Sequence, residues 1–259
     1  MKLDIQAICH KGMVRGNNED AISVGGVFLS DDSIELSVNT PEEGFFYLLV
    51  SDGMGGHEKG EEASRFTLTE LQEEFNMQHI SPDSFEEDFR QLVGRISEGL
   101  NREAAGLGQE HPMGCTLTGV VWHYGNIWSV NAGDSRTYRF RGGMLRQLTT
   151  DDNERGITGD PEASKLLLNC IGGGCNGTVS IENINGKILP GDILLICSDG
   201  LSDMVSDEDI ESVLSGGTPD VSENAQNTRT SAIELFRTAC ENGGADNISI
   251  ILATVREES

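Results

Sequence analysis

The sequence predicts an α+β domain, with antiparallel sheets inside and helices on the outside. Two observations support this class. Residues 116–148 hold two pairs of segments with period-two hydrophobicity, each pair joined by only two residues, and such short connections force antiparallel pairing. Two amphipathic helices are predicted just before them, and consecutive helices of this kind can cover one face of a sheet. A chain of 259 residues suits a single large domain over 1–259.

The first half of the chain is expected to contain strands followed by two helices. Alternating apolar side chains predict a strand over 3–9, and the apolar run 45–50 predicts a buried strand. Between them we expect a polar loop over 11–19, a strand over 20–29 and a polar connection over 31–43. The helices are predicted over 61–78 and from Phe85 to Ala104, where apolar residues recur at helical spacing.

The second half is expected to return to strands. The predicted hairpins are 116–124 with 127–132 around the turn 125–126, and 137–141 with 144–148 around 142–143. After them we expect a short helical piece over 162–168, a strand over 188–197, a helix after Ser206, a loop over 216–224, a helix over 225–241 and a strand over 247–255.

The composition excludes several classes of protein. A net charge of −25 leaves no basic stripe for nucleic acid and disfavours an anionic membrane surface. None of the six cysteines forms a CxxC pair, and no signal sequence or membrane-spanning run is visible. We therefore expect a soluble, cytoplasmic protein that binds neither nucleic acid nor membrane.

Acidic residues stand at the ends of several apolar runs, each beside glycine. Asp52, Asp134 and Asp199 follow such runs, and Asp246 precedes the last one. If these ends converge, they form an all-oxygen site for hard divalent cations.

The motifs around these residues resemble the metal-dependent Ser/Thr protein phosphatases of the protein phosphatase 2C type. The matching motifs are Arg15-x3-Glu19-Asp20, Ser51-Asp52-Gly53-Met54-Gly55-Gly56-His57, Gly114-Cys115-Thr116, Ala132-Gly133-Asp134-Ser135-Arg136, Ser198-Asp199-Gly200-Leu201-Ser202-Asp203 and Asp246-Asn247. The methionine at 54 resembles the bacterial branch of the family. The resemblance covers about 5–255 and implies an α-β-β-α sandwich of two antiparallel sheets between helical layers.

The resemblance also implies a dinuclear Mn²⁺ or Mg²⁺ centre. By position, Asp52 would bridge the two ions, the Gly53 carbonyl would bind one, Asp199 and Asp246 would complete the other, Glu19 and Asp20 would bind or orient metal-bound waters, and Asp134 and Asp203 with Asp199 would form a third, weaker site. Arg15 would hold the phosphate oxygens. A hydroxide bridging the two metals would attack phosphorus directly, without a phosphoenzyme.

Two features depart from the family pattern. Animal members carry a proposed general-acid histidine after Asp-Gly, where this chain has Met54. We expect the general acid to be either His57, three residues after Met54, or a water bound to the third metal. The flap segment, 149–174, is also shorter than in typical members.

A cysteine phosphatase is a competing interpretation. Cys9-x5-Arg15 has the spacing in which a thiolate attacks phosphorus and arginine holds the phosphate. The intervening residues contain one glycine and no helix obviously follows, so the metal mechanism is favoured.

Two non-enzymatic interpretations also compete with it. The residues from Asp151 to Glu162 nearly match the ligand pattern of an EF-hand calcium-binding loop. Arg155, however, occupies the fifth position, where that loop has a calcium ligand. A catalytically silent adaptor with the same fold is disfavoured because every expected metal ligand is present.

The favoured prediction is a phosphatase of the bacterial type that removes phosphate from serine and threonine in proteins. It would oppose a Ser/Thr kinase in signal transduction and act as a monomer. The protein substrates follow from the resemblance and not from a docking motif.

Overall fold

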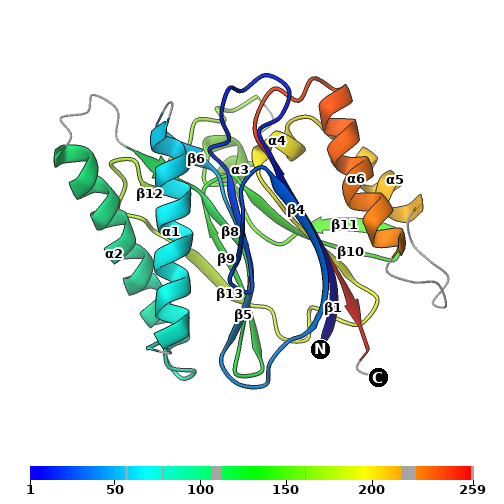
Figure 1. Cartoon of the computed structure of the whole chain (residues 1–259), viewed down its shortest axis with the longest axis horizontal. Coiled ribbons are helices and arrows are strands. Elements are labelled where there is room, and N and C mark those ends of the chain that lie inside the picture. Colours follow the sequence, from blue (N-terminus) through cyan, green and yellow to red (C-terminus); the bar gives the residue numbers. More distant parts are fainter. Residues whose placement is uncertain (56–57, 78, 107–112, 161, 217–225, 258–259) are drawn as a thin grey trace.

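Two six-stranded antiparallel sheets lie face to face between two layers of helices in the computed structural model (Figure 1). The structure describes residues 1–55, 58–77, 79–106, 113–160, 162–216 and 226–257. Within these residues, no helix is both long enough and apolar enough to cross a membrane.

The first sheet joins the two ends of the described chain. Its order is β11 (Met144–Gln147), β10 (Arg136–Arg141), β14 (Ile193–Cys197), β15 (Ile248–Arg256), β1 (Lys2–His10) and β4 (Asp32–Asn39). Strands β1 and β15 are central neighbours and pair from Lys2 with Arg256 to His10 with Ile248.

The second sheet holds the middle of the chain. Its order is β13 (Ser180–Asn183), β9 (Asn126–Ala132), β8 (Leu117–His123), β5 (Phe45–Ser51), β2 (Ala21–Val24) and β3 (Val27–Leu29). A small third sheet has the order β12 (Ile171–Gly172), β7 (Gly114–Cys115) and β6 (Gly53–Met54).

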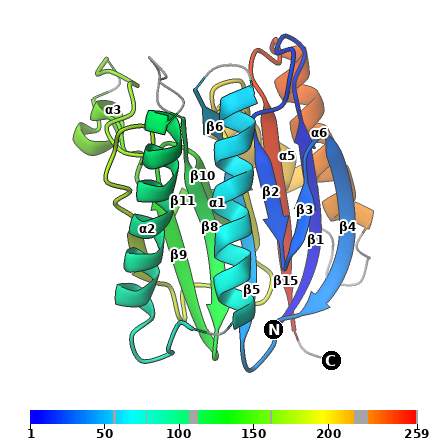
Figure 2. The ribbon, with the colours of Figure 1, turned by 60° about the vertical axis from the view of Figure 1, so that its left-hand side comes forward.

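The helices cover the outer faces of the two large sheets. Figure 2 shows α1 (Glu58–Met77) and α2 (Phe85–Gly106) side by side over the second sheet. On the first sheet lie α5 (Asp207–Gly216) and α6 (Gln226–Glu241), with the short α4 (Asp199–Ser202) beside β15. Helix α3 (Glu154–Thr158) belongs to the flap segment.

The buried side chains form three apolar layers because successive residues of a strand point to opposite faces. In β5, Leu49 packs under α1 and α2, while Leu48 packs between the two sheets. In β14, Ile196 packs between the sheets and Leu195 packs under α5 and α6. The predicted layered fold, with sheets inside and helices outside, is confirmed.

Two predictions for residues 20–43 were wrong. The single strand over 20–29 is a hairpin, because Gly25 and Gly26 adopt φ values of 52° and 93° and turn the chain between β2 and β3. The polar connection over 31–43 contains β4, an edge strand paired with β1. Alternation of Ile34, Leu36 and Val38 is the half-buried signal that this prediction overlooked.

The first hairpin turn lies one residue earlier than predicted. His123 pairs with Asn126, so the turn residues are Tyr124 and Gly125, with φ values of 46° and 75°. The second hairpin has the predicted turn, since Arg141 pairs with Met144.

Two further predictions placed elements in the wrong part of a segment. The helical piece expected over 162–168 is instead α3, which Asn153 caps by accepting a hydrogen bond from the Gly156 N–H. The strand expected over 188–197 begins only at Ile193 because Pro190 and Gly191 form a turn. Most of the predicted loop over 216–224 lies outside the described residues.

Candidate active site

The strand ends that carry acidic residues meet at one end of the sandwich, near β6, α3 and α4 in Figure 1. They line a pocket of about 270 Å³. Seven of the predicted site residues line it: Arg15, Glu19, Asp52, Gly53, Asp134, Asp199 and Asp246. Asp20 and Asp203 flank this group, and His57 lies outside the described residues.

Asp52 follows β5 and is fixed through its backbone. Its N–H donates to Thr116 Oγ1 at 3.0 Å, and its carbonyl accepts from the Thr116 N–H at 2.8 Å. The Thr116 hydroxyl lies 2.7 Å from Ser135 Oγ, next to Asp134. Hydrogen bonds therefore tie the turn that carries Asp52 to the turn that carries Asp134.

Gly53 lies where the backbone passes very close to two other segments. Its N–H donates to the Glu19 carbonyl at 3.1 Å. A Cβ atom at this position would lie 2.1 Å from the Gly60 carbonyl oxygen and 2.5 Å from that of Glu19. Only glycine fits here, because these two carbonyls leave no room for a side chain.

Asp199 and Asp246 are brought together by the pairing of β14 with β15. The Ser198 N–H donates to the Ser249 carbonyl at 3.1 Å, close to both acidic residues in the chain. A Cβ atom at Gly200 would lie 1.8 Å from the Asn247 carbonyl oxygen, so glycine permits the close packing of α4 on the start of β15.

Asn247 organises the loop that carries Arg15 and Glu19. Its side-chain amide donates to the carbonyls of Lys11 at 3.0 Å and Asn17 at 2.9 Å. Its Oδ1 accepts from the Glu19 N–H at 2.8 Å. The sequence prediction included Asn247 in a motif but gave it no role; it positions the loop.

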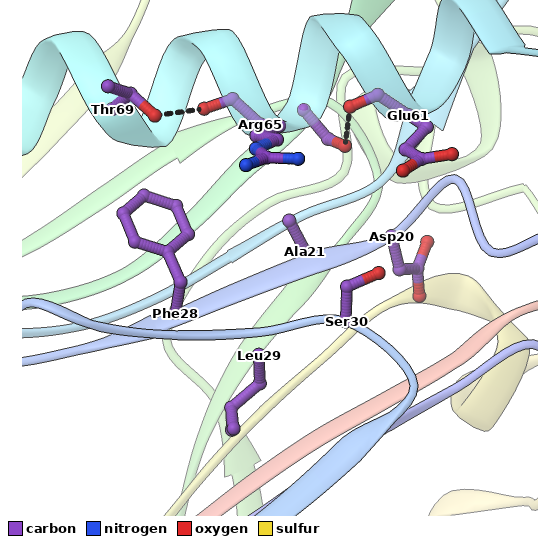
Figure 3. Close-up of a pocket in the computed structure, with 9 residues that line it drawn as sticks. Asp20, Ala21, Phe28, Leu29, Ser30, Glu61, Arg65 and Thr69 are labelled. Atoms are coloured by element: carbon purple, nitrogen blue, oxygen red, sulfur yellow. Dashed lines mark hydrogen bonds between the residues drawn. The ribbon is translucent and has the colours of Figure 1, made fainter.

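Asp20 is the most deeply buried carboxyl group of the site. This residue is 1% exposed, and its side chain accepts a hydrogen bond from Ser198 Oγ at 2.8 Å. It also borders a second cavity of about 350 Å³ between α1 and the β2–β3 hairpin, where Phe28 and Arg65 form part of the wall (Figure 3).

Burial and mutual repulsion raise the pKa values of the acidic residues. Burial, with smaller contributions from neighbouring carboxylates, raises the pKa of Asp20 and of Asp134 to about 7. The pKa values of Asp52 and Asp199 are also raised, first by burial and then by the other acidic residues. Four carboxyl groups held this close need bound protons or cations.

The donor set fits hard divalent cations. The buried Oδ1 atoms of Asp20 and Asp199 have no hydrogen-bond partner. The other atoms nearby that could bind a hard metal ion are oxygens. Two other carboxylates form ion pairs with basic side chains: Asp246 with Arg15 at 2.6 Å and Asp203 with Lys165 at 2.5 Å. Among the described residues, no group of three or more Asp, Glu, His or Cys side chains is arranged as a metal site.

Without divalent ions, the protein should be more stable at pH 5 than at pH 7.5. The ordinary pKa of an aspartate is 3.8, whereas that of Asp134 and Asp20 is about 7 in the fold, so the folded chain binds more protons than the unfolded chain between these values. Stability then falls as the pH rises through this window. Melting temperatures measured in excess chelator would test this, with Asp134→Asn expected to show a shallower fall. Equal slopes in both proteins would contradict it.

The geometry at Cys9 argues against a cysteine phosphatase. Cys9 is 1% exposed, and burial raises the pKa of its thiol to about 12. Arg15 points to Asp246 instead. A nucleophilic cysteine requires an accessible thiolate, which this position does not provide.

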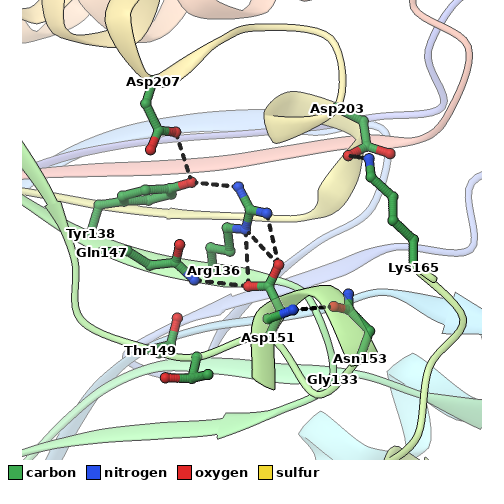
Figure 4. Close-up of polar contacts among 12 residues, drawn as sticks. Gly133, Arg136, Tyr138, Gln147, Thr149, Asp151, Asn153, Lys165, Asp203 and Asp207 are labelled. Carbon is green, nitrogen blue, oxygen red and sulfur yellow. Dashed lines mark hydrogen bonds and ion pairs between the residues drawn. The ribbon is translucent and has the colours of Figure 1, made fainter. Parts of the chain in front are cut away.

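The calcium-loop interpretation fails for a similar reason. Arg136 donates to Asp151 from Nε at 3.0 Å and from Nη2 at 2.7 Å (Figure 4). Asn153 caps α3, which interrupts the loop. The residues expected as ligands are therefore engaged in holding the flap.

Comparison with known proteins identifies the family. The protein phosphatase 2C family model matches residues 28–231. Serine/threonine protein phosphatase PstP of Mycobacterium tuberculosis is 31% identical over 95% of this chain, which spans only 43% of that relative. Serine/threonine phosphatase stp of Listeria welshimeri is 30% identical, with 93% of this chain and 92% of the relative covered.

Solved structures agree with the sequence matches. The crystal structure of the PstP phosphatase of Mycobacterium tuberculosis superposes with a TM-score of 0.75 at 27% identity, over 99% of this chain and 100% of that one. The PstP catalytic domain in complex with two manganese ions superposes with a TM-score of 0.73 at 29% identity, covering 98% and 100%. The chain therefore belongs to the protein phosphatase 2C family of Ser/Thr phosphatases.

Proposed function

We propose that this chain is a metal-dependent phosphatase that hydrolyses phosphoserine and phosphothreonine in proteins. The observation that carries the proposal is the pocket itself, which gathers Asp52, Asp134, Asp199 and Asp246 beside Arg15. Both PstP of Mycobacterium tuberculosis and the Listeria relative carry the name of a Ser/Thr phosphatase, which supports the same activity here.

Different acidic residues of the pocket would bind each of two Mn²⁺ or Mg²⁺ ions. Asp52 and the Gly53 carbonyl would serve one ion, Asp199 and Asp246 would complete the other, and Glu19 and Asp20 would orient water. The ions supply Lewis-acid activation of water and of the phosphoryl group when bound. A third, weaker ion is proposed for the acidic cluster, defined as Asp134, Asp199 and Asp203.

Arg15 is the proposed phosphate-binding residue. Its side chain is 52% exposed, and its guanidinium donates to Asp246 across the pocket. Because an arginine fork matches two phosphate oxygens, a substrate phosphate can replace this carboxylate partner once Asp246 binds metal.

The proton for the leaving serine or threonine has two proposed sources. Met54 lines the pocket where a histidine is expected in animal members, and a thioether cannot donate a proton. His57 or a water held near Asp134 would then protonate the leaving oxygen. The flap segment, 149–174, would border the substrate, and Leu167 from it lines the pocket.

The proposed substrates are proteins phosphorylated by a Ser/Thr kinase, and the proposed active form is a monomer. The test is the hydrolysis of a phosphothreonine peptide by the full chain in Mn²⁺ and in excess chelator. We expect turnover in Mn²⁺ and its loss in chelator, restored by added Mn²⁺. Full activity in chelator would refute the metal mechanism, and no turnover under any condition would favour the silent adaptor.

A further inference from the structure

The acidic cluster comes from two parts of the fold, and Asp134 and Asp199 line the same pocket. Asp134 follows β9, Asp199 begins α4, and Asp203 ends that helix with its N–H donating to the Asp199 carbonyl at 2.8 Å. The charges of Asp199 and Asp203 both act on Asp134. A cation beside one of these carboxylates is therefore also attracted by the charges of the others.

Lys165 reaches this cluster from the flap segment. Its Nζ donates to Asp203 Oδ1 at 2.5 Å (Figure 4). Its charge also acts favourably on Asp199. The ammonium group thus pairs with one of the three carboxylates proposed to hold the third divalent ion, and its charge acts on a second.

The backbone around Lys165 is held in place on both sides. Before it, the Ser164 carbonyl accepts from the Arg155 N–H at 3.1 Å. After it, Leu167 pairs with Asn153, and the Leu168 N–H donates to the Asp152 carbonyl at 2.8 Å. The segment that carries Lys165 is therefore tied to the rest of the flap, and its side chain, 46% exposed, reaches Asp203.

We propose that Lys165 is a built-in cation at the acidic cluster and competes there with the third, weaker divalent ion. A tethered ammonium has a high effective concentration at its carboxylate partner. It also repels a divalent ion brought within a few ångströms. The chain would load two ions readily and a third only when the flap withdraws Lys165. This inference rests on the proposed function, because it presupposes the two-ion centre.

The test counts Mn²⁺ ions by calorimetric titration of the full chain after chelator treatment, with free Mn²⁺ followed by electron paramagnetic resonance. We expect two ions to bind tightly to the wild-type chain. In Lys165→Met, we expect a third ion to bind about tenfold more tightly, or better, because one competing positive charge is gone. Adding Asp203→Asn to Lys165→Met should weaken that third site again.

Two further variants separate this role from simpler ones. Lys165→Arg keeps the charge and should bind the third ion as weakly as the wild type. Lys187→Met removes an equal charge from an ion pair with Glu182 on β13 and should leave all sites unchanged.

The possible outcomes are distinguishable. An unchanged third-site affinity in Lys165→Met would overturn the proposal. Lys165 would then have only a structural role, as an ion pair between the flap and Asp203. Equal tightening in Lys187→Met would also overturn it, because the effect would come from net charge alone. If the wild-type chain bound no Mn²⁺, the proposed function itself would fail.

Discussion

Replacement of Asp52 by asparagine should lower the Mn²⁺-dependent turnover of p-nitrophenyl phosphate by about a thousandfold, the equivalent of several kcal/mol of metal-ion catalysis. The same change should raise the melting temperature in chelator at pH 7.5. Asp52 is crowded by Asp20, Asp199, Asp246 and Asp134, and burial with these charges raises its pKa. A neutral amide removes part of that repulsion. The measurements are steady-state kinetics and thermal unfolding of the same preparations.

Glu42→Gln is the matched control for Asp52→Asn. Glu42 is an exposed carboxylate in the connection after β4, so its neutralisation changes the net charge by the same amount. It should leave turnover and melting temperature nearly unchanged. A turnover loss below about tenfold in Asp52→Asn would contradict the assignment of Asp52 as a metal ligand, and a lower melting temperature in chelator would contradict the repulsion argument.

Arg136→Met should destabilise the fold by about 3–5 kcal/mol, because it leaves a buried carboxylate without its partner. Asp151 is 7% exposed as a side chain and receives hydrogen bonds from Arg136 and, at 2.8 Å, from Gln147 Nε2. Arg136 also donates to the hydroxyl of Tyr138 at 2.9 Å, which in turn donates to Asp207 at 3.2 Å (Figure 4). Urea unfolding of the wild type and the variant measures the difference.

Arg90→Met gives the reference for a surface ion pair. Arg90 lies 3.4 Å from Glu86 on α2, both about half exposed, and such pairs contribute about 0–1 kcal/mol. Arg136→Met combined with Asp151→Leu should recover part of the lost stability, since no buried charge then remains alone. If Arg136→Met cost no more than Arg90→Met, the Arg136–Asp151 pair would not be what anchors the start of the flap.

The gathering of acidic residues in one pocket could be predicted from the sequence because several of them carry local signals. Asp52 and Asp199 each follow a run of apolar residues that is typical of a buried strand, and glycine follows each of them. The structure brings these positions into one pocket with Asp134 and Asp246. Lys165 had no comparable signal, because its contact with Asp203 joins segments 38 residues apart and depends on the path of the flap.

The errors in the predicted fold have two origins, an overlooked local signal and contacts between distant segments. Strand β4 was missed because its polar residues face solvent at a sheet edge, although Ile34, Leu36 and Val38 alternate with them. The flap was assigned a helix over 162–168, whereas Asn153 and the Arg136–Asp151 pair fix its only described helix earlier. Such tertiary contacts override local propensity.

The central pairing of β1 with β15 also bears on how the protein matures during translation. Asp52 and Asp199 leave the ribosome before Asp246. Strand β1 can pair with β4 early, but its other edge has no partner until β15 has been synthesised. Contacts between such distant segments form late in folding. A nascent chain arrested before residue 246 would therefore hold Asp52, Asp134 and Asp199 without a closed first sheet, so the acidic pocket would be complete only after β15 is released.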